Sequence, residues 1–350
     1  MGPVPVHGTV MSRSLRLALV VPATVPVAVT VEDDGLKPGQ GKQIAEKFLK
    51  TDKMKIITGI IFSNVAGAVV PDVVDDGAFY ISPNAAPSNF AGKECNKNYF
   101  VIPWQNDSLH ESAGQLATNL GYKTAVILGA NYQAGKDALT GFKRLFKGKI
   151  LEEIYTKLDQ TDFAAEMAQI RNAKPDVVYQ FHPGGQGITF LKQYGQAGLL
   201  NTVPMVGAEP SMDAVIMKAL GNDAVGFNVT SHWNSDFDNA ANKKFMEAYT
   251  KKFNKTPTYY GAMGYDTAQA IGAALKGAKG IGNLDAFRTE MKKANFESVR
   301  GKFKFDVNNH PIQDWYALKV EKGADGAPYL KTVSKVLEQV GDVYAKDCKL

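Results

Sequence analysis

The chain has 350 residues, enough for two domains with separate cores, and its 45% hydrophobic and 21% charged residues are ordinary for a globular protein. The formal net charge of +5 comes from basic residues spread along helix-like stretches without interleaved aromatic residues. This pattern favours solvated helix faces over a nucleic-acid surface, so we expect no nucleic-acid partner. No apolar run is long enough to span a bilayer.

Strand-like and helix-like stretches alternate along most of the chain. Apolar runs of strand length lie at 27–31, 56–62, 78–82, 99–103, 124–128, 150–155, 176–181, 203–207 and 226–233. Helical spacing predicts helices over 40–50, 65–74, 108–120, 136–146, 163–173, 188–197, 212–220, 243–253, 260–276 and 284–294. A late hairpin is predicted over 302–306 and 315–320. Such alternation is typical of crossover units and parallel sheets.

The predicted strands fall into two groups, before and after Trp104, and the helices after Trp233 have no sheet of their own. These helices must cover an earlier sheet, so the chain crosses between lobes more than once, which implies a hinge. We predict an α/β fold of two Rossmann-like lobes with parallel-type sheets joined by a multi-crossing hinge. The boundaries are 27–105 plus 235–304 for the first lobe, 106–234 plus 305–330 for the second, 331–350 for a tail and 1–26 for an atypical segment. A cleft between two hinged lobes suits closure around a small solute.

The stretch from Thr58 to Ser88 reads as strand, polar turn, helix and strand. Ser63 and Asn64 are residue types that cap helices well, and they precede a helix of small and apolar residues. A parallel sheet places such turns at the carboxyl edge of its strands, where small ligands bind. We therefore predict half of a ligand site at Ser63 and the Asn84-Ala85-Ala86 turn. The alternative is that Ser63 serves only as a helix cap.

The two cysteines, Cys95 and Cys348, lie in polar, loop-like contexts without a neighbouring Cys or His at metal spacing. Either both thiols are free or they form one disulfide, and the polar contexts favour the disulfide. A disulfide implies an oxidising compartment.

The segment 11–29 has the charged start and apolar middle of a secretion signal. Pro22 and Pro26 interrupt its apolar part, and cleavage near its end would remove the strand predicted at 27–31. The signal interpretation is therefore weak.

Enzymatic functions find little local support. The HPGGQG run at 182–187 follows a strand like a phosphate-binding loop, but it lacks GxGxxG and the Lys-Ser/Thr pair of a P-loop. The histidines are far apart in sequence, and no HExxH or GxSxG element is present. We expect no enzyme, no cofactor and no metal site. A ligand-sensing regulatory domain remains an alternative, but no effector domain accompanies it.

Several segments in order resemble one family, the branched-chain amino-acid type of solute-binding protein from ABC uptake systems (type I periplasmic binding proteins). They are VEDDGLKPGQGKQIAEKF, ITGIIFSNVAGAVVP, FYISPNAAPS, YQAGKDALTGFK, DFAAEMAQIRNAKPDVVYQFHPGGQG, MVGAEPSMD and GKFKFDVNNHPIQDWYALKV. The resemblance implies a two-lobed monomer in the periplasm, with a membrane permease as partner. The family's Gly-rich first turn has no match before Val29, so its first strand and helix are expected to be missing or altered here.

The resemblance also implies roles for individual residues. Ser63, flanked by Phe62 and Asn64, matches the serine that holds the ligand carboxylate. The turn of Asn84, Ala85 and Ala86 completes that hold, although Ala86 replaces an expected Thr or Ser.

In the second lobe, Tyr132 matches a tyrosine that closes over the ligand, and Phe181 and His182 fall where an aromatic residue lines the cleft. Glu209 matches the acid that pairs with an α-ammonium group. The alternatives are a loop aromatic for Tyr132, a satisfied turn histidine for His182 and plain surface for Glu209.

The ligand assignment has two versions. Glu209 indicates an α-amino acid such as leucine, isoleucine or valine. Ala86 and the aromatic-rich second lobe indicate an aromatic or keto acid, for example a benzoate or a phenylpropanoid. We expect a branched-chain amino acid, with the aromatic acid as the alternative.

Overall fold

The computed structural model describes residues 6–11 and 27–350. The strands are β1 (Val6–Met11), β2 (Val27–Glu32), β3 (Ile56–Thr58), β4 (Phe79–Ser82), β5 (Tyr99–Val101), β6 (Thr124–Ala130), β7 (Lys149–Thr156), β8 (Val177–Phe181), β9 (Met205–Ala208), β10 (Asn228–Ser231), β11 (Lys304–Phe305), β12 (Pro311–Lys322) and β13 (Pro328–Val340).

The α-helices are α1 (Pro38–Glu46), α2 (Ser63–Asp75), α3 (Asn106–Asn119), α4 (Gln133–Leu145), α5 (Ala164–Ala173), α6 (Gly184–Gln196), α7 (Ala214–Leu220), α8 (Ala240–Phe253), α9 (Tyr259–Gly277) and α10 (Leu284–Lys292). A π-helical turn, Lys47–Thr51, extends α1, and short 3₁₀ turns lie at Ser88–Phe90, Glu209–Ser211, Gly221–Ala224 and Ala345–Asp347.

The chain divides into two compact units. Unit 1 comprises the residues up to Gln105, then Phe237–Gln313 and Gly341–Leu350, and unit 2 comprises Asn106–Asp236 and Asp314–Val340. The crossing predicted after residue 304 instead falls within β12, after Gln313. The predicted tail 331–350 is also divided, because β13 belongs to unit 2 while Gly341–Leu350 belongs to unit 1. Much of β13 is exposed, so its sequence carries little of the apolar signal that marks a buried strand.

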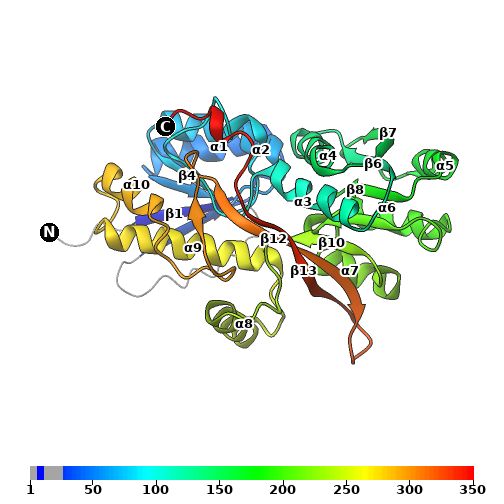
Figure 1. Ribbon diagram of the computed structural model, residues 1–350. Helices are drawn as coiled ribbons and strands as arrows, with labels where there is room; N and C mark the ends of the chain where they lie inside the picture. Colours follow the sequence, from blue (N-terminus) through cyan, green and yellow to red (C-terminus); the bar gives the residue numbers. More distant parts are fainter. Residues whose placement is uncertain (1–5, 12–26) are drawn as a thin grey trace. The chain divides into compact units, whose positions relative to one another are not determined.

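Unit 1 contains a five-stranded sheet in the order β2-β1-β3-β4-β5, and its strand pairings are parallel. Neighbouring residues point to opposite faces: Ile57 and Tyr80 pack toward α1 and α2, whereas Ile56 and Phe79 pack toward α9 and α10. Figure 1 shows these two helix pairs on the two sides of the sheet. The helices that follow Trp233 in the sequence thus cover the first sheet. This was predicted because no sheet of their own accompanies them.

The first strand of the sheet is present. β1 pairs in parallel with β2 on one side and with β3 on the other, so Val10 lies opposite both Val31 and Thr58. Of the two possibilities predicted for this strand, missing or altered, the structure therefore shows a strand that is present, and no sheet edge is left open between β2 and β3. The sequence of β1 is the altered part. The helix expected after it and the apolar part of the signal-like stretch fall at 12–26, outside the described residues.

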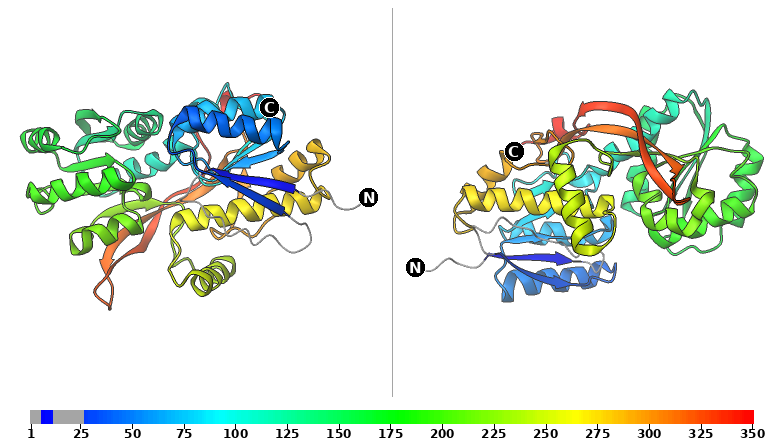
Figure 2. Two further views of the ribbon diagram at one scale, coloured as in Figure 1. Left: turned by 180° about the vertical axis from the view of Figure 1, so that it is seen from behind. Right: turned by 90° about the horizontal axis from the view of Figure 1, so that it is seen from below.

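Unit 2 contains the strands β13-β12-β10-β9-β8-β6-β7 in that spatial order, and β11 pairs with the first residues of β12. The strands from β7 to β10 are parallel, and β12 runs antiparallel to β10. One face packs against α3 and α4, and the other against α5, α6 and α7. Figure 2 shows β12 and β13 as two long strands side by side. Because β6, β8, β9 and β10 are parallel, their carboxyl ends share one edge.

The structure joins Cys95 and Cys348, which are 253 positions apart, in a disulfide within unit 1. Two further contacts fasten the same part of the chain. The Nδ2 of Asn308 donates to the Ala91 carbonyl (2.8 Å), and the Asp342 carboxylate lies 2.8 Å from Nδ1 of His310. The segment Gly341–Leu350 is thereby held against the loop between β4 and β5.

Candidate functional site

The unit 1 half of the candidate site begins where β3 leads into α2. Phe62 takes the N-cap position with extended backbone (φ −95°, ψ 131°), and its carbonyl accepts from the N–H groups of Val65 and Ala66. Ser63 is the first helical residue and is buried. The N-cap position thus belongs to Phe62, and Ser63 is the residue after it. The start of a helix of this length favours a negatively charged group, because its first N–H groups point outward.

The turn after β4 lies next to this helix start. Ser82 organises the turn, because its hydroxyl donates to the Ala85 carbonyl (2.7 Å) and accepts from the N–H of Asn84 (3.3 Å). The Nδ2 of Asn84 donates to the carbonyl of Ile61 (2.7 Å). Since β3 and β4 are neighbours in the sheet, these bonds bring Asn84, Ala85 and Ala86 beside the Phe62-Ser63-Asn64 segment.

Two buried oxygens at this edge have no hydrogen-bond partner among the residues that the structure describes: Oδ1 of Asn64 and Oδ1 of Asn84. A buried acceptor without a donor costs about 1–3 kcal/mol, so such atoms call for an explanation. Both can accept from an N–H or O–H group of a ligand. The bond from Nδ2 of Asn84 to Ile61 fixes which end of that amide is the oxygen.

In unit 2 the predicted residues follow the ends of neighbouring parallel strands. Tyr132 is the N-cap of α4, just after β6, and Phe181 is the last residue of β8. Their rings stack nearly parallel, with centroids 6.4 Å apart and planes at 12°. Glu209 follows β9, the strand next to β8. Tyr132, Phe181 and Glu209 therefore follow neighbouring strand ends at the carboxyl edge of the unit 2 sheet.

His182 lies at the same edge but is enclosed by its own unit. The ring is fully buried, its Nε2 lies 2.9 Å from Oγ1 of Thr156, and its Nδ1 lies 3.1 Å from Oε1 of Gln180. Phe190 stacks on it with centroids 4.7 Å apart. Burial lowers the pKa of His182 to about 3, so the ring is neutral. These contacts favour the alternative of a satisfied turn histidine.

The glycines of the HPGGQG run serve packing. A Cβ on Gly187 would stand 2.0 Å from the carbonyl oxygen of His182, so only glycine lets α6 start this close to the end of β8. Gly184 also has φ +64°, which side chains other than glycine rarely adopt. The run therefore has a structural explanation that requires no phosphate.

Glu209 is 4% exposed, and its carboxylate accepts a hydrogen bond from the hydroxyl of Ser231. No basic side chain pairs with it in the part of the chain that the structure describes. Burial raises the pKa of Glu209 to about 8; the bond from Ser231 opposes this shift and nearby Asp213 adds to it. The carboxyl group is thus shielded from water. A cation that binds beside it would stabilise its charged form.

Two further residues at this edge were not predicted from the sequence. Ser231, the partner of Glu209, ends β10, which is the strand next to β9. Its position at the end of a predicted strand was an available signal. His110 of α3 packs edge-on against Phe181 (4.6 Å, 70°), and its Nδ1 lies 2.6 Å from the hydroxyl of Tyr179. No local pattern pointed to His110, because a helix residue reaches the sheet only through tertiary packing.

The sequence model of the family described as "Periplasmic binding protein" matches residues 22–326, which is most of the chain. The chain belongs to the periplasmic binding protein family. This result confirms the predicted family and its α/β fold with parallel-type sheets. Periplasmic binding proteins of this kind are solute-binding proteins of ABC transporters and are not a class of enzymes.

Individual members of the family are similar over nearly the whole chain. The Leu/Ile/Val-binding protein homolog 6 of Brucella melitensis is 26% identical over 318 residues, covering 87% of this chain and 80% of that protein. An ABC-transporter solute-binding protein from R. palustris, solved in complex with benzoate, is 26% identical with a TM-score of 0.91, and the match covers 100% of both chains. Another, from Rhodopseudomonas palustris BisB5 in complex with 3,4-dihydroxybenzoic acid, is 27% identical with a TM-score of 0.88, covering 97% and 99%.

Among the described residues, no helix has the length and apolar character that crossing a membrane requires. Among the same residues, no three His, Cys, Asp or Glu side chains gather as metal ligands would.

Proposed function

We propose that this periplasmic binding protein takes up a small aromatic carboxylate outside the cytoplasm and delivers it to the membrane permease of an ABC transporter. The observation that carries the choice of ligand is the parallel pair of Tyr132 and Phe181 at the unit 2 edge. A flat aromatic ring can stack on such a pair, and each aromatic contact contributes about 0.5–1.5 kcal/mol beyond the area it buries. The similar solute-binding proteins with benzoate and 3,4-dihydroxybenzoic acid support the same class of ligand.

In this proposal the ligand carboxylate binds at Ser63 and the start of α2, beside the Asn84–Ala86 turn. In unit 2, Tyr132 and Phe181 are the residues proposed to recognise an aromatic ring. Ala86 offers no hydroxyl, so the carboxylate relies on Ser63 and on backbone N–H groups. The disulfide between Cys95 and Cys348 supports an oxidising, extracytoplasmic location. We further propose that the protein acts as a monomer and binds no nucleic acid.

A branched-chain amino acid is the second candidate, and one observation favours it. Glu209 is a buried acid without a basic partner in the described structure, and an α-ammonium group would supply that partner. Oδ1 of Asn64 and Oδ1 of Asn84 can also accept from an ammonium group. A ring hydroxyl offers the same oxygens a donor but provides no charge for Glu209.

A thermal-shift and calorimetry panel separates the two candidates. The ligands are benzoate, 4-hydroxybenzoate, the non-aromatic analogue cyclohexanecarboxylate, leucine, isoleucine and valine. A ligand at 100 times its Kd adds about 2.7 kcal/mol to the free energy of unfolding, which is readily measured. We expect benzoates to bind more tightly than cyclohexanecarboxylate. Tighter binding of leucine than of any benzoate would reverse the assignment, and an absence of binding across the panel would contradict both candidates.

Two substitutions locate the ligand. Ser63→Ala should weaken every carboxylate that binds, about tenfold, because it removes one charge-assisted hydrogen bond. Glu209→Gln should leave benzoate affinity within about twofold and abolish amino-acid binding, since it removes the charge while keeping the shape. If Ser63→Ala binds as the unaltered protein does, the carboxylate lies elsewhere.

A further inference from the structure

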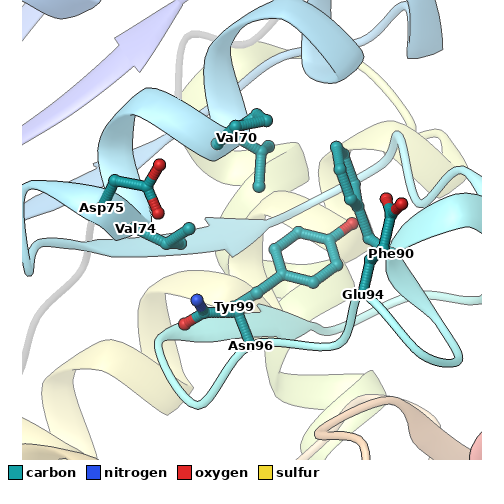
Figure 3. Close-up of a pocket in the computed structure, with 8 residues that line it drawn as sticks. Val70, Val74, Asp75, Phe90, Glu94, Asn96 and Tyr99 are labelled. Atoms are coloured by element: carbon teal, nitrogen blue, oxygen red, sulfur yellow. The ribbon is translucent and has the colours of Figure 1, made fainter.

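Unit 1 contains a pocket at the opposite end of α2 from Ser63. Its volume is about 160 Å³, and it lies between the last turns of α2 and the loop that leads to β5. Figure 3 shows the side chains of Val70, Val74, Asp75, Phe90, Glu94 and Tyr99 around it. None of its lining residues belongs to the candidate carboxylate site at Ser63 and the Asn84–Ala86 turn, so the pocket is separate from that site.

The walls of the pocket are largely apolar, and contacts between aromatic rings hold them in place. Phe90 and Tyr99 meet edge to face, with centroids 5.6 Å apart and planes at 71°. Behind them, Tyr80 stacks on Tyr99 (6.0 Å, 23°) and His310 packs against it at 5.7 Å. An apolar cavity of roughly 150 Å³ holds one benzene molecule, so this pocket has room for a single ring or a branched alkyl group.

The mouth of the pocket is negatively charged. Asp75 and Glu94 are exposed, and Figure 3 shows them on opposite sides of the pocket, with the rings of Tyr99 and Phe90 between them. In the described part of the chain, neither carboxylate has a hydrogen-bond or ion-pair partner. Asp75 is also the last residue of α2, where the helix dipole adds partial negative charge.

The neighbouring acids of α2 differ in this respect. Asp72 pairs with Lys42 at 3.1 Å, and Asp76 pairs with Lys50 and with Lys55. Asp75, which faces the pocket, is the acid of this group left without a lysine. In a chain with a formal net charge of +5, the carboxylates of Asp75 and Glu94, which have no lysine partner among the described residues, lie at the rim of an apolar, aromatic pocket.

We propose that this pocket binds a small organic cation, namely an ammonium group that carries one ring or one branched alkyl chain. The apolar part enters between Val70, Val74 and the two rings. The ammonium group stays at the mouth, where Asp75 and Glu94 attract it and the aromatic rings add cation–π attraction. This inference does not depend on which carboxylate the protein carries.

Titration with phenethylammonium, followed by calorimetry and by NMR of the Tyr99 and Phe90 rings, tests the proposal. The matched probes are neutral 2-phenylethanol and anionic phenylacetate, which share the ring. We expect saturable binding of the cation, weaker binding of the alcohol, and affinity for the cation that falls as salt rises. Equal binding of the cation and the alcohol would overturn the role of charge.

Variants place the cation in the pocket. The double substitution Asp75→Asn with Glu94→Gln should weaken phenethylammonium binding about two- to thirtyfold, because exposed charge pairs contribute 0.2–1 kcal/mol each. Asp72→Asn is the matched control, since Asp72 lies on the same helix and pairs with Lys42. It should change the affinity less than twofold. An unchanged affinity in the double variant would overturn the proposal, as would displacement of the cation by saturating benzoate or leucine.

Discussion

Glu209 and His182 are both buried at the end of the unit 2 sheet, yet their burial has opposite consequences for pH dependence. Burial disfavours the charged form of each, so it raises the pKa of Glu209 to about 8 and lowers that of His182 to about 3. The buried imidazole opposes folding only when pH falls below its ordinary value near 6.5. The buried carboxyl opposes folding only when pH rises above its ordinary value near 4.5.

The first prediction concerns Glu209 in the ligand-free protein. The folded state holds the proton of Glu209 more tightly than the unfolded state does, so its burial lowers stability progressively between pH 4.5 and pH 8. Glu209→Gln should match the unaltered protein near pH 5 and exceed its stability at pH 9, by on the order of 1–3 kcal/mol. Urea unfolding at several pH values measures the difference. A difference of the same size at pH 5 and at pH 9 would contradict this prediction.

At the scale of elements, α3 and α4 of unit 2 approach each other closely because of glycines. A Cβ on Gly114 would stand 2.2 Å from the carbonyl oxygen of Phe142, and a Cβ on Gly141 would stand 2.3 Å from that of Asp107. The close approach also lets Arg144 of α4 reach the carboxylates of Asp107 and Glu111 on α3. Two helices of modest hydrophobicity are thereby packed through their backbones.

Gly141→Ala should therefore destabilise unit 2 by about 1–3 kcal/mol, because the added methyl group forces the two helices apart. Gly67→Ala is the matched comparison: Gly67 lies inside α2, and nothing stands within 4 Å of the Cβ it would gain. That substitution should stabilise unit 1 by about 0.5–1 kcal/mol, from helix propensity alone. Denaturant midpoints of the two variants, with hydrogen exchange to assign the unit, test this. A stable Gly141→Ala would show that the helices can shift without cost.

The sequence predicted the elements best where a buried strand gives an unbroken apolar run. The runs at 56–62 and 176–181 contain β3 and β8, the run at 124–128 covers most of β6, and the small-residue pattern at 65–74 lies within α2. β13 was missed because its polar residues face solvent. β1 was missed because the sequence before Val29 has no match to the family's first turn. At the site, position along the strands placed Glu209 and Phe181, but side-chain partners such as Ser231 and His110 depend on packing between distant segments.

At the scale of the molecule, unit 1 is assembled from three separate stretches of chain, and the disulfide joins two of them. Replacing Cys95 and Cys348 by serine should lower stability by up to about 5 kcal/mol in the chain-entropy model, because the loop it closes is long. We expect this loss of stability to be confined to unit 1. Hydrogen exchange should show faster exchange in 91–98 and 341–350, with unit 2 unchanged. If hydrogen exchange became faster to the same extent in both units, the two units would be unfolding together.

The division of unit 1 also sets an order of events during synthesis. Unit 2 lacks only its β12–β13 hairpin once Asp236 has been made, whereas unit 1 still awaits α9 and α10, which cover one face of its sheet. Until then Ile56, Phe79 and Phe100 are uncovered, although their strands come early in the chain. Cys95 must likewise remain a thiol until Cys348 is available. The early strands of unit 1 are therefore the part of the nascent chain that most needs protection from aggregation.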